Sequence, residues 1–317
     1  MASQSSAISA HSVRTQNQGR LGRDLNLALT VAVFLLPASL IFTVFLIFPI
    51  AQAAYFSVFK WNGLGPVENF IGLENYLRLF QDKVFRGALF HNLLIIVLSL
   101  GIQLPASLGL ALLVWRKLPG RVFFRTVFFL PYVLSEVITG IIWLFIYHPE
   151  FGLVTTLFQS LLPGLTKTSW LGDPHTALNA IFVVVCWKYF GFYLILYLAG
   201  LQQIPTELEE AARIDGASDA QVFRYVILPL LGSILRLTIY LSILGSLQIF
   251  VLVWVMTQGG PVQSSNTMAT YLFKFGFQRF ALGYGSTVAV VLFLIGLVFS
   301  VAYQRAILQQ DYTGGVG

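Results

Sequence analysis

The chain has 317 residues, of which 57% are hydrophobic and only 10% are charged, and its formal net charge is +6. This composition excludes an ordinary soluble domain and is typical of a protein that crosses the membrane several times. The single cysteine excludes a disulfide framework and a cysteine-based metal site. The sequence has no phosphate-binding loop of the G-x-x-x-x-G-K-[ST] type, no nucleophile elbow and no metal-ligand spacing, so we expect no catalytic residue, no metal and no cofactor.

Six apolar stretches are long enough to cross a membrane as helices, so the predicted fold class is an all-α membrane protein with six transmembrane helices. The spans are predicted at Leu27–Ile50, Leu93–Val114, Val127–Tyr147, Ala177–Leu198, Leu237–Met256 and Tyr284–Tyr303. Between the third and fourth spans, Phe151–Leu165 is predicted to form a short amphipathic helix on the outer surface. Residues 1–24 predict a flexible cytoplasmic tail and residues 306–317 a C-terminal tail, with one transmembrane domain at residues 25–305.

The polar segment between spans four and five carries strong helix signals. Thr206 with Glu209, and Ser218 with Gln221, each fit the capping box that opens a helix. Gly216 lies between the two boxes and can adopt the left-handed conformation that ends a helix. The segment therefore predicts a helix, a turn and a second helix.

Basic residues indicate the orientation of the chain in the membrane. The loop between spans two and three contains Arg116, Lys117, Arg121 and Arg125. Short cytoplasmic loops are enriched in lysine and arginine, so this loop is predicted to face the cytoplasm. With six spans, both termini and the segment between spans four and five then face the cytoplasm. The net positive charge follows from this topology rather than from nucleic-acid binding.

The same polar segment contains a motif with fixed gaps. Its residues are Glu210, Ala211, Ala212, Gly216, Leu228 and Pro229. The motif resembles the signature loop of binding-protein-dependent ABC importer permeases, which usually have isoleucine where this chain has Val226. Two outer segments, Phe70–Tyr76 and Thr257–Pro261, also resemble the sugar-transport branch of that family, in particular the first permease of the maltose and glycerol-phosphate type.

This resemblance implies a transmembrane permease subunit of an ATP-driven importer in the bacterial plasma (inner) membrane. It implies four kinds of partner: a second permease, two ATP-binding cassette ATPases, an extracytoplasmic solute-binding protein and membrane lipid, but no nucleic acid. The helix that carries the motif would be the coupling helix, which sits in a cleft of the ATPase. The subunit would form half of the pathway for a carbohydrate, with a di- or oligosaccharide expected and glycerol phosphate or a polyol as alternatives.

Two ionisable residues, Glu136 and Lys188, lie near the middle of spans three and four. An unpaired charge there costs about 2.5–3.5 kcal/mol on insertion scales, so each should have a partner or face water. Three arrangements remain open: a direct or water-bridged pair, Lys188 free in the pathway, or separate contacts with backbone carbonyls or the partner permease. A pair would suit a neutral sugar, whereas a free Lys188 would suit an anionic solute.

The later spans should line the substrate pathway. The candidate residues are Lys188, Tyr189, Phe192 and Leu196 in span four and Ser242, Gly245, Ser246 and Ile249 in span five. Aromatic rings and small polar groups suit a sugar, whose C–H faces stack on rings while its hydroxyls form hydrogen bonds. The competing interpretation is ordinary helix packing, in which small residues mark close contacts.

Two other functional classes have sequence requirements of their own. An ion-coupled secondary transporter would need inverted repeats and a broken-helix ion site, and the sequence shows no repeat. An intramembrane enzyme would need a reactive pair, for which only Glu136 and Lys188 are available.

Overall fold

The computed structural model describes residues 29–115, 120–161 and 169–308. These residues are helical apart from turns, loops and one isolated antiparallel bridge between Phe59 and Phe70. The chain divides after Tyr55 into two compact units. The predicted tail at residues 1–24 lies outside the described residues, and of residues 306–317 only the first three are described, within the π-helix η5, Gln304–Leu308.

The first unit contributes one long apolar helix. The candidate span covers Leu29–Phe56 and includes a π-helical segment, η1 (Thr43–Ile47), followed by α2 (Phe48–Phe56). It contains most of the span predicted at Leu27–Ile50. None of its described residues in η1 or α2 is buried, as expected for a helix whose surface faces lipid or another protein.

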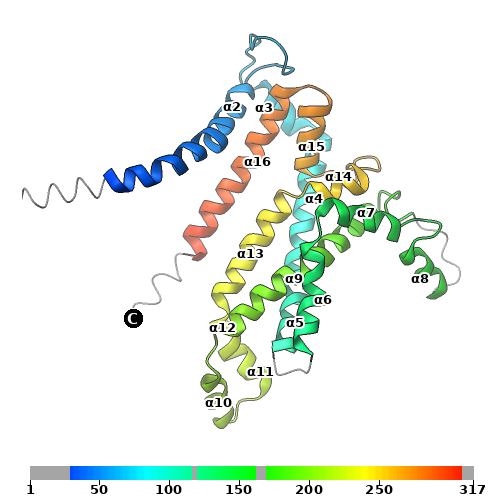
Figure 1. Ribbon diagram of the computed structural model, residues 1–317. Helices are drawn as coiled ribbons and strands as arrows, with labels where there is room; N and C mark the ends of the chain where they lie inside the picture. The colour runs from blue at the N-terminus through cyan, green and yellow to red at the C-terminus, as the bar shows by residue number, and fades with distance from the viewer. Residues whose placement is uncertain (1–28, 116–119, 162–168, 309–317) are drawn as a thin grey trace, which may run out of the picture. The chain divides into compact units, whose positions relative to one another are not determined.

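The second unit contains the remaining helices (Figure 1). Along the chain they are α3 (Glu74–Gln81), α4 (Lys83–Leu98), η2 (Ser99–Gln103), α5 (Leu104–Trp115), α6 (Arg121–Val133), α7 (Glu136–Ile146), α8 (Leu153–Leu161), α9 (Ala177–Leu201), α10 (Thr206–Ile214), α11 (Asp219–Val222), η3 (Phe223–Ile227), α12 (Leu228–Leu230), α13 (Gly232–Leu247), α14 (Val251–Thr257), α15 (Met268–Phe273), η4 (Lys274–Gln278) and α16 (Leu282–Tyr303). Helix α8 lies within the amphipathic stretch predicted at Phe151–Leu165.

Four helices of the described chain are long and apolar enough to cross a membrane, or six spans if each of two bent helix pairs counts as one. Span three, predicted as one helix, is such a pair: α6 and α7 meet at 100° around Leu134 and Ser135. Both residues are extended, with ψ of 144° and 142°. Pro131 lies in the last turn of α6 and cannot donate a backbone hydrogen bond there, which favours ending the helix.

Span five also differs from the continuous helix predicted at Leu237–Met256. Helix α13 begins earlier, at Gly232, and ends at Leu247, and α14 begins only at Val251. The side chain of Asn92 donates to the carbonyls of Ser246 (2.7 Å) and Leu247 (3.3 Å), which the break frees. Hydrophobicity continues across the break, so the apolar pattern alone did not reveal it.

Helix α9 is the most buried span of the second unit and packs against α5 and α6. Gly191 permits the close approach to α6, because a Cβ atom there would lie 2.0 Å from the carbonyl oxygen of Phe128. Close backbone contact at a glycine is a common way for membrane helices to pack without a hydrophobic driving force. Helix α9 therefore lies beside the break in span three, where the candidate site is found.

Candidate functional site

Lys188 of α9 holds one side of the break in span three. Its Nζ donates to the carbonyl oxygens of Leu134 (2.5 Å) and Tyr132 (3.4 Å), and the residue is only 3% exposed. These carbonyls lie at and just beyond the carboxyl end of α6, where the helix dipole favours a positive charge. The ammonium group thus satisfies backbone acceptors that the break leaves without helical partners.

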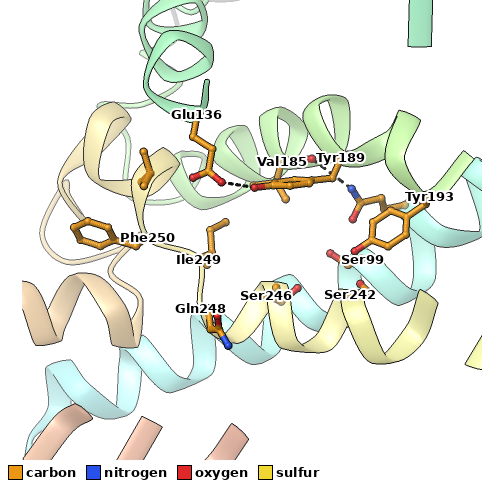
Figure 2. A pocket seen from close by; sticks show the side chains of 13 residues that line it. Ser99, Glu136, Val185, Tyr189, Tyr193, Ser242, Ser246, Gln248, Ile249 and Phe250 are labelled. Atoms are coloured by element: carbon orange, nitrogen blue, oxygen red, sulfur yellow. Dashed lines mark hydrogen bonds between the residues drawn. The ribbon is translucent and has the colours of Figure 1, made fainter. Parts of the chain in front are cut away.

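Tyr189, the next residue of α9, holds the other side of the break. Its hydroxyl donates to Oε1 of Glu136, the first residue of α7 (Figure 2). A carboxylate in the first turn of a helix is stabilised by the helix dipole. Among the described residues, Glu136 and Lys188 form no direct ion pair. The structure therefore contradicts a direct pair and a Lys188 free in the pathway, and it shows Lys188 on backbone carbonyls.

A cavity of about 350 Å³ lies between the break in span three, helix α9 and the break in span five. Its lining residues are Ser99, Gln103, Glu136, Val185, Tyr189, Tyr193, Ser242, Gly245, Ser246, Gln248, Ile249, Phe250 and Val251. Figure 2 shows the Tyr193 ring beside Ser99 and Ser242, and the Glu136 carboxylate facing the hydroxyl of Tyr189. The cavity thus combines aromatic rings with hydroxyl, amide and carboxylate groups.

The structure brings five of the predicted pathway residues to this cavity: Tyr189, Ser242, Gly245, Ser246 and Ile249. Lys188 does not line it, because its side chain turns to the α6 carbonyls. Phe192 does not line it either, and stacks on Tyr132 with ring centroids 5.0 Å apart. Leu196 packs with the hydrophobic cluster around Leu194 instead.

Sequence reasoning missed several lining residues. These are Ser99, Gln103, Val185, Tyr193, Gln248, Phe250 and Val251. Gln103 gave a usable signal, since a buried amide in an apolar span needs a hydrogen-bond partner, and its Nε2 donates to the carbonyl of Val185 at 3.3 Å. Gln248 and Phe250 line the cavity only because span five breaks there, so no helical repeat pointed to them.

The polar segment after span four has the predicted helix–turn–helix form, at the carboxyl end of α9 (Figure 1). Helix α10 ends with Gly216 in the left-handed conformation at φ +84°. The amide of Ala217 donates to Ala212 O and that of Gly216 to Arg213 O, both at 3.0 Å. This is the Schellman arrangement that satisfies the last carbonyls of a helix.

The two predicted capping boxes have different outcomes. The Ser218–Gln221 box is confirmed, with the Gln221 side chain accepting from the Ser218 amide at 2.7 Å. The Thr206–Glu209 box is wrong: Pro205 occupies the N-cap position and no side chain caps α10. Thr206 is already the first helical residue, because the extended Pro205 places the turn one residue earlier.

Four of the six motif residues are exposed on the surface of this segment. Glu210, Ala211, Gly216 and Pro229 are exposed, whereas Ala212 and Leu228 are half-buried. Ala212 packs against the hydrophobic cluster that contains Val222, Ile227 and Leu231. Ile214, although apolar, is 86% exposed. An exposed apolar side chain beside acidic and small residues fits a surface that contacts another protein.

Comparison with known families identifies the chain. Residues 103–313 match the family model described as binding-protein-dependent transport system inner membrane component. The chain belongs to this family. The matched residues include the segment between spans four and five and most of the cavity lining. As an ABC importer permease it is the non-catalytic transmembrane component of its transport system, which rules out the intramembrane-enzyme and secondary-transporter alternatives.

Individual relatives agree with this assignment, and a solved structure has a similar fold. The probable ABC transporter permease protein YurN of Bacillus subtilis is 38% identical over 276 residues, covering 86% of this chain and 94% of that protein. The diacetylchitobiose uptake system permease protein NgcF of Streptomyces coelicolor is 34% identical, covering 82% of this chain and 77% of its own length. A bacterial alginate ABC transporter, solved in complex with an alginate pentasaccharide-bound periplasmic protein, matches with a TM-score of 0.79 at 22% identity, over 90% of this chain and 96% of that one.

Proposed function

We propose that this permease forms half of the translocation pathway for a carbohydrate, with a di- or oligosaccharide as the solute. The observation that carries the proposal is the cavity between the two broken spans, which presents tyrosine rings together with hydroxyl, amide and carboxylate groups. Sugars need both kinds of contact, because their C–H faces stack on aromatic rings while their hydroxyls require hydrogen-bond partners.

The relatives support a carbohydrate but leave the solute open. NgcF is named for diacetylchitobiose, and other relatives are named for trehalose and maltose or for sn-glycerol 3-phosphate. The glycerol-phosphate alternative gained weight from a Lys188 free in the pathway. In the structure the Lys188 ammonium group contacts the carbonyls of Tyr132 and Leu134 and does not line the cavity. Lys188 therefore gives no support to glycerol phosphate as the solute.

The segment Glu210–Pro229 is proposed to couple the spans to ATP hydrolysis. Its exposed Glu210, Ala211 and Gly216 would enter a cleft of an ATPase subunit, and closure of two ATPases would move α10 as a rigid element. The α11–α12 segment is joined to α13 at a bend of 68°, so motion of this segment would reach span five and the cavity through α13. A second permease would complete the pathway, and a solute-binding protein would deliver the solute.

The proposed orientation places both termini and α10 in the cytoplasm. The basic loop between spans two and three and the coupling role of α10 both support it. Single-cysteine labelling of intact cells with a membrane-impermeant reagent tests this topology, in a Cys186→Ser background. A cysteine replacing Gly216 should be protected until the membrane is opened.

Uptake by reconstituted vesicles tests the function. The assembled transporter and its binding protein should accumulate a radiolabelled saccharide when ATP is supplied on the α10 side. An ion gradient without ATP should give no uptake. Uptake driven by the gradient alone would overturn the proposed mechanism, and ATP-driven uptake of glycerol 3-phosphate but no saccharide would overturn the proposed solute class.

A further inference from the structure

The electrostatics of the cavity centre on one carboxylate. Among the described residues that line the cavity, Glu136 is the only aspartate, glutamate, lysine, arginine or histidine. Lys188, the nearest candidate for a counterion, is directed to the carbonyl oxygens of Tyr132 and Leu134. The ammonium group still attracts the Glu136 carboxylate through space, but no ion pair joins the two among the described residues. The carboxylate is therefore not neutralised by a direct ion pair.

The carboxylate also keeps hydrogen-bonding capacity for a solute. An ionised carboxylate can accept about four hydrogen bonds through its two oxygens. Among the described residues only Tyr189 donates to it, and that bond uses Oε1. Glu136 is half-buried and lines the cavity, which leaves Oε2 to accept from a solute hydroxyl or ammonium group. The Tyr189 bond fixes the side chain, so the acceptor is preorganised.

We propose that Glu136 sets the charge selectivity of this cavity: it accepts hydrogen bonds from uncharged or amino-bearing saccharides and repels solutes with phosphate, sulfonate or carboxylate groups. This inference rests on the proposed role of the cavity as the solute pathway. An anion would lie in a confined space with a fixed like charge and no cationic side chain among the described lining residues. A hydroxyl-rich solute would instead donate to Oε2 and stack on Tyr189, Tyr193 or Phe250.

Charged thiol reagents can measure the sign of this field without knowledge of the solute. Gly245 is a suitable reporter position, because it lines the cavity and a Cβ atom there meets nothing within 4 Å. The variant is Gly245→Cys in a Cys186→Ser background, purified as the assembled transporter. Its modification rates with cationic trimethylammonioethyl and anionic sulfonatoethyl methanethiosulfonate are each divided by the rate at which the same reagent modifies a free thiol. The ratio of the normalised cationic rate to the normalised anionic rate reports the electrostatic potential at the cysteine.

The expected result is a ratio that favours the cationic reagent and falls about sixfold with Glu136→Gln. One unit charge about 8 Å away in water contributes about 0.5 kcal/mol, which changes each rate about 2.4-fold, in opposite directions for the two reagents. Glutamine keeps an acceptor for Tyr189, so the change removes charge with little change of shape. Tyr189→Phe is the matched control, since it removes the hydrogen bond but keeps the charge, and its ratio should stay close to the parent value.

The outcomes separate this inference from the proposed function. A reactive thiol whose ratio is the same with glutamate and glutamine overturns the charge selectivity alone. A thiol that neither reagent modifies, with or without ATP, overturns the cavity as a water-filled pathway. Ile249→Cys repeats the measurement from another lining residue if the Gly245→Cys protein does not assemble. A cationic preference that Glu136→Gln abolishes at either position supports the proposal.

Discussion

Replacing Lys188 with methionine tests whether span four holds the break in span three. Methionine has a similar length but no donor, so the carbonyls of Leu134 and Tyr132 lose their charged partner. Hydrogen bonds to a charged group contribute about 1.5–3 kcal/mol each, and two of them about 3–6 kcal/mol. Removing a charge from the membrane interior returns about 2.5–3.5 kcal/mol. From the midpoints of these ranges, the expected net loss of stability is about 1.5 kcal/mol.

The measurement is unfolding of the detergent-purified transporter, followed by tryptophan fluorescence. Trp187 precedes Lys188 in α9 and contacts Trp143 of α7, with ring centroids 5.6 Å apart, so the signal should respond to the break region. Lys188→Arg is the matched control, because arginine keeps a charged donor for both carbonyls, and it should recover part of the loss. Equal stability of the methionine variant and the parent would refute the stabilising role of the Lys188 contact with α6. An arginine variant no more stable than the methionine variant would refute it as well.

Three further predictions follow from the same geometry. Because Lys188 and Glu136 have separate partners, the losses of folding stability caused by Lys188→Met and by Glu136→Gln should be additive to within about 1 kcal/mol. A double variant that is more stable than this sum predicts would instead indicate a direct pair. Gly216→Leu should strain the left-handed turn by about 1 kcal/mol or more, and it should reduce ATP-driven uptake far more than it reduces assembly of the transporter. Asparagine tolerates the left-handed conformation, so the Gly216→Asn variant should assemble better than the leucine variant. Wild-type uptake by the leucine variant would contradict the coupling role. The subunit reconstituted alone should give no saturable saccharide uptake, since half a pathway leaves polar groups facing lipid, and saturable uptake would disprove it.

Local signals in the sequence predicted the helical elements well. Apolar length located the four continuous candidate spans and the two regions where the structure has bent helix pairs, and the Ser218–Gln221 box and Gly216 located the turn between α10 and α11. The Thr206–Glu209 box failed because the same residue types can occupy the first helical turn when a proline precedes them. Capping motifs are local, so a neighbouring backbone conformation is enough to shift them by one residue.

Hydropathy could not predict the breaks in spans three and five. Span five stays apolar through its interruption, and the break is stabilised by residues distant in sequence, including Asn92 and Thr267, which donates to the carbonyl of Ile249 at 3.0 Å. The same limitation explains the cavity: face periodicity found Ser242 and Ser246, which precede the break, but not Gln248 just beyond the end of α13. The partners of Lys188 are backbone carbonyls that the bend in span three leaves without helical donors. Rules for charge pairing match side chains with side chains, so they could not identify these carbonyls.

The most direct test of the central claim is to fill the cavity and measure transport. Gly245→Trp would place a large side chain into the cavity of about 350 Å³, at a position where the first added atom meets no neighbour. Gly101→Trp is the matched control, because that glycine also has open space around it but does not line the cavity. If the cavity is the solute pathway, ATP-driven saccharide uptake by reconstituted vesicles should fall at least about tenfold with Gly245→Trp and remain near the parent rate with Gly101→Trp. Parent-level uptake by an assembled Gly245→Trp transporter would contradict the account.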